Sequence, residues 1–112
     1  YRTISNVPIP KLHPVNVQQF LSEIFVLMSN NAKEAEVEVK ILPIPANATI
    51  KIDRKLIEQV LINLINNSIH ALGGVKNPLI KISCIVEQEK TLLIVSDNGK
   101  GIEEKIMNQI FL

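Results

Sequence analysis

Two long stretches carry apolar residues at every third or fourth position, and this helical period is the feature that most limits the folds open to the chain. One stretch covers residues 17–35 and follows Asn16, a residue type suited to cap the N-terminus of a helix. The other covers residues 54–72 and is followed by Gly73 and Gly74, which are typical of a helix stop. The sequence therefore predicts two long amphipathic helices.

Between and after these helices the apolar period falls to two, as in half-buried strands. The predicted strands cover residues 37–41, 50–52, 79–87 and 91–96. Each has apolar residues on one face only, whereas strands of a sheet covered on both sides are apolar throughout. The pattern predicts an α/β fold of the two-layer sandwich type, with helices on one face of the sheet and water on the other.

The 112 residues are enough for one domain. Prolines at positions 8, 10 and 14 disfavour helix, so residues 1–14 are expected to form a linker from an upstream domain, and residues 15–112 the domain itself. The chain begins at Tyr1 and stops in the apolar phrase NQIFL. We therefore expect both ends to be cut from a longer protein.

The charge and the metal-binding residue types argue against several classes of function. A net charge of +1 gives no electrostatic reason for binding nucleic acid or an anionic membrane, and no apolar run approaches the length of a membrane span. The single Cys84 lies in an alternating strand and is expected to be a packed, reduced thiol, which fits a reducing cytoplasm. His13 and His70 lack companions at ligand spacing, which argues against a zinc site.

The segment VSDNGKGIEE, residues 95–104, places an aspartate and two glycines at the end of a predicted strand. A hairpin turn at Asp97-Asn98-Gly99 would predict a strand after the loop. We instead expect a helix there, because Ile102, Ile106 and Ile110 recur every four residues. The spacing fits neither a calcium loop nor a P-loop nor a dinucleotide fingerprint. These residues alone leave open whether the loop is structural or binds a ligand.

The second predicted helix carries an amide-rich stripe where a solvated helix normally carries Lys and Glu. At 100° per residue, five polar residues fall within a strip of about 100°; they are Gln59, Asn63, Asn66, Asn67 and His70. The three asparagines cost the helix on the order of 2 kcal/mol relative to alanine. One interpretation is that the amides bond to neighbouring loops. The other is that their oxygens hold Mg²⁺ and its phosphates.

Together the two segments resemble a known family. The helix segment Asn63-Leu64-Ile65-Asn66-Asn67, followed after about thirty residues by Asp97-Asn98-Gly99-Lys100-Gly101, is similar to the N box and first glycine box of sensor histidine kinases. The resemblance covers residues 16–112. It implies the Bergerat ATP-binding fold, with a mixed, largely antiparallel sheet, shared with type II topoisomerases, heat-shock chaperones and mismatch-repair ATPases. The second glycine box and the lid of the family are not in this chain.

The resemblance also implies roles for individual residues. Asp97 would accept a hydrogen bond from the adenine amino group of ATP, Asn67 would bind Mg²⁺, and Asn63 would stand beside Asn67. The remaining nucleotide-binding residues implied are His70 near the phosphates or ribose, Ala71 and Ile102 at the adenine, and Gly99 and Gly101 where the backbone approaches the base. His70, Ala71 and Ile102 could equally have purely structural roles.

Asn63 stands where the ATP-hydrolysing relatives have a glutamate, and an amide cannot act as a general base. The resemblance therefore implies phosphoryl transfer to a histidine on an adjacent dimerisation and phosphoacceptor domain, with no complete catalytic set in this chain, which is expected to be inactive in isolation. His13 lacks the helical context of an acceptor. A response regulator would be the partner of the parent, expected to be a homodimer with this domain in the cytoplasm.

Two other functions remain open at this stage. One is an anti-sigma-factor serine kinase of the same fold, and the other is a degenerate nucleotide-binding module kept for docking. The sequence leaves open the signal, the cognate response regulator, and whether the parent is anchored in the inner membrane.

Overall fold

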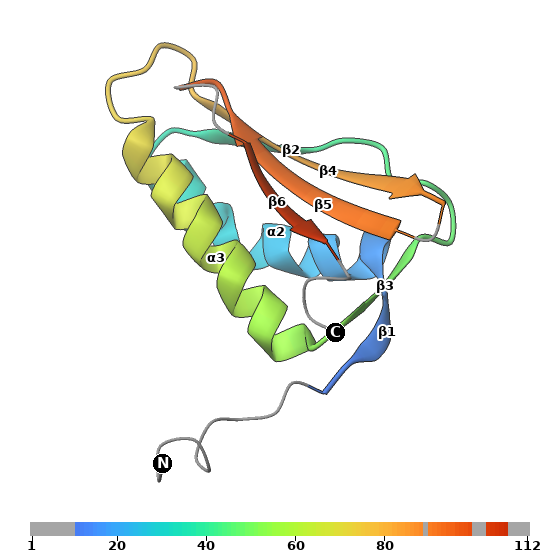
Figure 1. Ribbon diagram of the computed structural model, residues 1–112. Coiled ribbons are helices and arrows are strands. Elements are labelled where there is room, and N and C mark those ends of the chain that lie inside the picture. Colours follow the sequence, from blue (N-terminus) through green and yellow to red (C-terminus); the bar gives the residue numbers. More distant parts are fainter. Residues whose placement is uncertain (1–10, 89, 100–102, 108–112) are drawn as a thin grey trace, which may run out of the picture.

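The computed structural model describes residues 11–88 and 90–99, and the backbone of residues 103–107. Two helices pack on one face of a four-stranded sheet, and a separate two-stranded sheet lies at one end (Figure 1). In chain order the elements are β1 (His13–Asn16), α2 (Val17–Glu34), β2 (Glu38–Ile41), β3 (Thr49–Ile52), α3 (Arg54–Ala71), β4 (Leu79–Glu87), β5 (Lys90–Asp97) and β6 (Glu103–Met107). This arrangement confirms the predicted two-layer α/β sandwich.

The larger sheet has the strand order β2-β4-β5-β6. Strands β2 and β4 are parallel, whereas β5 is antiparallel to both of its neighbours, so the sheet is mixed and largely antiparallel, as expected. The smaller sheet pairs β1 with β3 in antiparallel fashion. Thr91 on β5 joins the two sheets, because its hydroxyl donates a hydrogen bond of 2.9 Å to the carbonyl oxygen of Thr49.

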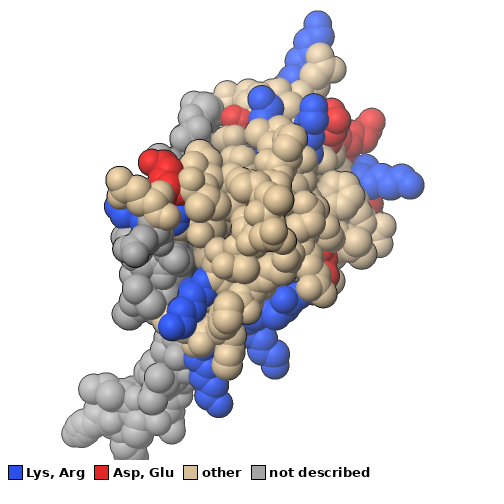
Figure 2. Space-filling view, turned by 90° about the vertical axis from the view of Figure 1, so that its right-hand side faces the viewer, with Lys and Arg blue, Asp and Glu red and all other residues tan. Residues whose placement is uncertain are grey.

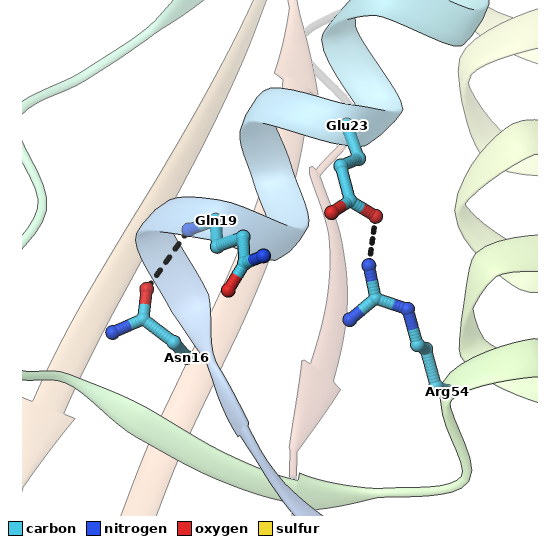
Figure 3. A network of polar contacts seen from close by, with 4 residues as sticks. All are labelled: Asn16, Gln19, Glu23 and Arg54. Carbon is cyan, nitrogen blue, oxygen red and sulfur yellow. Dashed lines mark hydrogen bonds and ion pairs between the residues drawn. The ribbon is translucent and has the colours of Figure 1, made fainter.

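Each helix begins after a residue whose side chain caps it, and the sequence predicted the first of these caps. The Asn16 side chain accepts a hydrogen bond from the Gln19 backbone N–H, which confirms Asn16 as the N-cap of α2. Asp53 caps α3 in the same way, through Leu56 N–H. The helices are held together at this end by an ion pair between Glu23 and Arg54 (Figure 3). The Arg54 guanidinium also lies 5.2 Å from the centroid of the Phe20 ring.

The core lies between the two helices and the inner face of the sheet. Its fully buried side chains come from every layer: Phe20, Leu21 and Ile24 on α2, Ile57, Leu61 and Ile65 on α3, Ile50 and Ile52 on β3, and Ile80, Ile82 and Leu93 on β4 and β5. Burial of each such side chain contributes about 1.5–3 kcal/mol. Cys84 is buried among them as a free thiol, and burial raises its pKa. The packed position predicted for this thiol is confirmed, and its reduced state stays a prediction.

The prediction of a helix after the glycine loop is wrong for the described part of that segment. Glu103–Met107 forms β6 and pairs with β5, with Ser96 opposite Glu103. A spacing of four fits one face of a helix but is also a multiple of two, so the pattern is equally compatible with a strand. Pairing to β5 satisfies backbone groups of that strand that a helix would leave open. Residues 108–112, the rest of the predicted helix, lie outside the described residues.

The chain that enters the domain is already attached to it before residue 15. His13 and Pro14, which we expected to belong to the linker, lie opposite Ile52 and Lys51 in the smaller sheet. The backbone N–H of Lys11 donates a hydrogen bond of 3.0 Å to the Asp53 carboxylate. Residues 11–14 therefore form part of the packed structure, and a linker upstream of them stays a prediction.

The basic and acidic side chains are distributed on the surface as the near-zero net charge of the chain suggests. Figure 2 shows a face whose centre is uncharged, with basic and acidic side chains both standing at its margins. Such a face has no broad field of one sign for a polyanion. In the part of the chain that the structure describes, neither helix has an apolar stretch able to cross a bilayer.

Candidate nucleotide-binding site

Helix α3 presents most of its amide-rich stripe to solvent. Gln59, Asn63, Asn67 and His70 are all exposed, whereas Ile57, Leu61 and Ile65 on the opposite side of the helix are fully buried. The helix therefore forms because one face packs into the core, which compensates for the poor helix propensity of asparagine. Within the described part of the chain, no hydrogen bond engages the amide oxygens of Gln59, Asn63 and Asn67, which are exposed to solvent.

Asn66 is the exception within the stripe. Its side-chain oxygen accepts a hydrogen bond of 3.2 Å from the side-chain amide of Asn31 on α2. Its backbone carbonyl lies 3.2 Å from Nδ1 of His70, one turn later. Asn66 therefore joins the two helices and orients His70, so the interpretation that the amides bond to neighbouring structure holds for this residue.

Asp97 lies at the end of β5, on the side of the sheet that the helices cover. Side chains alternate along a strand, and Leu93 and Val95, four and two residues earlier, are buried in the core. Oδ1 of Asp97 accepts a hydrogen bond of 2.9 Å from the backbone N–H of Gly99, which closes a tight turn. The carboxylate is half-exposed, and one of its oxygens is held by its own loop.

Gly99 lies against the end of α3. A β carbon at this position would stand 3.1 Å from Leu72 Cδ2, 3.1 Å from Asp97 Oδ1 and 3.8 Å from the Ala71 carbonyl oxygen. The first two distances are shorter than ordinary van der Waals contacts, so a side chain here would require Leu72 and Asp97 to shift by a few tenths of an ångström, whereas glycine lets the loop close on the helix end without such a shift. This contact brings together three of the residues that the sequence predicted, Ala71, Asp97 and Gly99.

We call the place where Ala71, Asp97 and Gly99 meet the corner of the site. The other predicted residues lie at various distances from it. Asn67 and Asn63 lie one and two turns before Ala71 on α3, which is about 6 and 12 Å along the helix axis at 1.5 Å per residue. A ligand bound at Asp97 would have to extend back along α3 to reach them. Gly101 and Ile102 fall outside the described residues.

The side chains at this corner fit the nucleotide and the metal that the sequence resemblance implies. A carboxylate with a free oxygen can accept a hydrogen bond from an amino group, and the exposed amide oxygens of Asn63 and Asn67 are ligands of the type that Mg²⁺ takes in proteins. Among the described residues there is no group of three or more His, Cys, Asp and Glu side chains that could hold a metal without help. A metal here would need the phosphates of the nucleotide as further ligands.

A cavity of about 560 Å³ has Leu72 among its lining residues. It is lined by the turn that follows α2 and by the loop between α3 and β4, including Glu36, Glu38 and Asn77. None of the predicted nucleotide-binding residues that the structure describes lines it.

The sequence motif did not single out Asn98, although it lies between two predicted binding residues. Its side-chain oxygen accepts a hydrogen bond of 2.9 Å from Leu79 N–H, and its side-chain nitrogen donates one of 2.9 Å to the Asn77 carbonyl oxygen. Both partners are about twenty residues away in sequence. The only signal in the sequence is the residue type, since an asparagine amide can donate and accept at once.

Comparison with known proteins agrees with this geometry. The model of the histidine kinase-, DNA gyrase B- and HSP90-like ATPase family matches residues 52–112, which is more than half of the chain. The chain is 32% identical over 62 residues to the methanogenesis regulatory histidine kinase FilI of Methanothrix harundinacea, covering 55% of this chain and 7% of FilI. It is 28% identical over 101 residues to the sensor histidine kinase ZraS of Salmonella typhimurium, covering 89% of this chain and 21% of ZraS.

Solved structures give the same result. The catalytic domain of the histidine kinase ThkA superposes with a TM-score of 0.72 at 27% identity, covering 82% of this chain and 61% of that domain's chain. ThkA in complex with the response regulator protein TrrA superposes with a TM-score of 0.74 at 26% identity, covering 90% of this chain and 30% of the ThkA chain. The present chain spans about a fifth or less of the length of FilI and ZraS. It belongs to the histidine kinase-, DNA gyrase B- and HSP90-like ATPase family, whose nucleotide is ATP, and its fold is that of a histidine kinase catalytic domain.

Proposed function

We propose that this chain is the ATP-binding catalytic part of a sensor histidine kinase, which transfers the γ-phosphoryl group of ATP to a histidine on an upstream dimerisation and phosphoacceptor domain. One observation carries the proposal: in a chain of this family, Gly99 closes the loop of Asp97 onto the end of the helix that presents Asn63 and Asn67. A carboxylate for the base and amide oxygens for the metal and phosphates then border the same corner.

In this proposal, different residues bind different parts of the nucleotide. Asp97 accepts a hydrogen bond from the adenine amino group, and Ala71 lies beside the base. Asn67 supplies an oxygen ligand for Mg²⁺, with Asn63 beside it and His70 near the phosphates or ribose. When bound, Mg²⁺ supplies neutralising charge to the phosphates. Gly99, Gly101 and Ile102 complete the adenine side of the site.

The chemistry at Asn63 favours transfer over hydrolysis. An amide has no lone pair basic enough to take a proton from water, so Asn63 cannot activate water as a glutamate would. Phosphoryl transfer needs mainly correct positioning of donor and acceptor together with electrostatic stabilisation, and a rigid helix provides the positioning. The acceptor histidine comes from another domain. We read His13 as outside that role, since it lies in β1 of this domain.

The partners follow from the same proposal. ThkA is found with the response regulator protein TrrA, which supports a response regulator as the partner of the parent of this chain. We further propose that the parent is a homodimer, that residues 1–10 belong to a linker from its dimerisation domain, and that this domain faces the cytoplasm. The anti-sigma-factor serine kinase and the degenerate docking module are not favoured, because the relatives named above are histidine kinases.

The proposal is tested by Asn67→Ala in the full-length parent. We expect Mg²⁺-dependent autophosphorylation, followed with radiolabelled ATP, to be lost while the circular dichroism spectrum stays unchanged, because an exposed ligand and no core side chain is removed. Asn30→Ala is the matched control, since it removes an exposed asparagine from the other helix, α2. Undiminished phosphorylation by Asn67→Ala would contradict the assignment.

A further inference from the structure

The side chain of Asn98 closes the end of the β4-β5 ladder in place of its own backbone carbonyl. The last backbone pair of this ladder is Ile80 with Asp97. One position further, Asn98 N–H donates to the Leu79 carbonyl oxygen at 3.2 Å, but Leu79 N–H donates to the Asn98 side-chain oxygen instead of to the backbone. The ladder is therefore complete at residue 98 while the main chain is already free to turn into the glycine loop.

This arrangement requires an amide of this length. The second half of the Asn98 side chain donates to the Asn77 carbonyl oxygen, where the chain turns through a left-handed backbone angle, with Asn77 at φ 50°. An aspartate could accept from Leu79 but could not donate to Asn77, and an alanine could do neither. Asn98 itself is exposed, so its apolar packing does not explain its presence.

These hydrogen bonds restrict Asp97, because its backbone is fixed both by its own pairing and by that of the next residue. On one side its backbone is paired with Ile80, and on the other Asn98 is held by three hydrogen bonds to the segment before and at the start of β4. The Gly99 N–H then occupies Oδ1 of Asp97. With the backbone fixed and Oδ1 engaged by Gly99, the orientation of the carboxylate, and so of Oδ2, is set before any ligand arrives.

We propose that Asn98 is a positioning residue for base selectivity, which holds Asp97 in the orientation that recognises the exocyclic amino group of adenine. The proposal rests on the function proposed above for Asp97. Asn98 needs no contact with the nucleotide for this role. Its loss is expected to weaken the recognition of adenine and to leave the binding of the triphosphate unchanged.

The experiment compares ATP with inosine triphosphate, which carries the same phosphates but has a carbonyl oxygen where adenine has its amino group. Both are titrated by NMR into the isotope-labelled 112-residue chain and into Asn98→Ala, Asn98→Asp, Asp97→Asn and the double variant Asn98→Ala/Asp97→Asn. The ratio of the two affinities cancels any effect of charge on the phosphates, including that of the added carboxylate in Asn98→Asp. Asn30→Ala serves as the control variant.

We expect Asn98→Ala to lower the preference for ATP by about tenfold, which is about 1.4 kcal/mol, with the affinity for inosine triphosphate unchanged. The double variant should lose no more selectivity than Asp97→Asn alone, because both changes remove one interaction. Faster hydrogen exchange at Leu79 N–H would report the lost side-chain bond directly. Asn98→Asp, which keeps the acceptor for Leu79, should show a smaller loss and remains informative if Asn98→Ala does not fold.

Two results would overturn the proposal in distinguishable ways. If Asp97→Asn removes the preference for ATP and the Asn98 variants keep it, or lose both nucleotides equally, Asn98 has no role in selectivity while the function of Asp97 stands. If Asp97→Asn leaves the preference unchanged, the adenine role of Asp97 is itself wrong, and the proposal for Asn98 fails with it.

Discussion

Asn31 on α2 donates a hydrogen bond to Asn66 on α3 across 3.2 Å, whereas the next residue of α3, Asn67, is exposed. Two adjacent asparagines of the same motif therefore have different surroundings. One is engaged in the contact between the helices, and the other is available to a ligand. This difference separates the effects of the two residues on stability and on binding.

We predict that Asn67→Ala raises the free energy of unfolding by about 0.5 kcal/mol, because alanine is the better helix former at an exposed position. Asn66→Ala gains the same propensity but loses the hydrogen bond to Asn31, worth about 0.5–1.5 kcal/mol, so its stability should change by less than about 1 kcal/mol. Urea unfolding of the two variants measures this. A loss of more than about 1 kcal/mol in Asn67→Ala would show that its side chain has a structural partner.

Asp97→Asn is expected to weaken ATP by about tenfold or more, because a hydrogen bond to a charged group contributes about 1.5–3 kcal/mol. The oxygen of the new amide can still accept from Gly99 N–H, as Oδ1 of Asp97 does, which turns the amide NH₂ toward the adenine amino group. Two donors then face each other. Isothermal titration against ATP checks the prediction, and equal affinity in variant and wild type would count against the role of Asp97.

The 112-residue chain should bind ATP only weakly, with a dissociation constant on the order of 1 mM, or about 4 kcal/mol. It contains one glycine box, and charge interactions left in water are worth about 1 kcal/mol at ~4 Å. We also expect little preference for ATP over ADP and no autophosphorylation. Calorimetry with the two nucleotides tests this, and micromolar binding with a large preference for ATP would show that the phosphate site is complete in these residues.

The ionised side chain of Asp53 is expected to stabilise the folded domain, and this stabilisation is lost in acid. The hydrogen bond from Lys11 N–H, followed by that from Leu56 N–H, lowers the pKa of this carboxyl in the folded chain. The stabilisation is therefore fully present above the ordinary aspartate pKa, about 3.9, and disappears as the pH falls through the lower folded value.

Asp53→Asn keeps an oxygen for Leu56 N–H but cannot titrate or accept from Lys11 N–H with its amide nitrogen. We expect this variant to be less stable than the wild type at neutral pH and to show a weaker dependence of stability on pH between about 5 and 2. Thermal unfolding followed across this range makes the comparison. Parallel pH profiles for the two chains would show that Asp53 makes no such contribution.

Some of the site could be predicted because its signals are local. The polar stripe of α3 depends only on the helical repeat, and the position of Asp97 depends only on where an alternating strand ends. That Asn66 bonds to the other helix while Asn67 is exposed could not be predicted. The difference depends on Asn31, which is 35 residues from Asn66 in the sequence. The role of Asn98 was missed for the same reason, because its partners are Leu79 at the start of β4 and Asn77 in the loop before that strand.

The amino-acid sequence specifies the two helices, the cap of α2 at Asn16, the one-sided strands and hence the two-layer architecture, because these follow from the periodicity of apolar residues and from local hydrogen bonding. That Glu103–Met107 is a strand depends on the fold, since isoleucines four residues apart fit both periods and the choice between them depends on pairing with β5. Likewise, the close packing of Gly99 against Leu72 becomes visible only in the fold. Contacts between residues distant in sequence decide such points, and no local pattern records them.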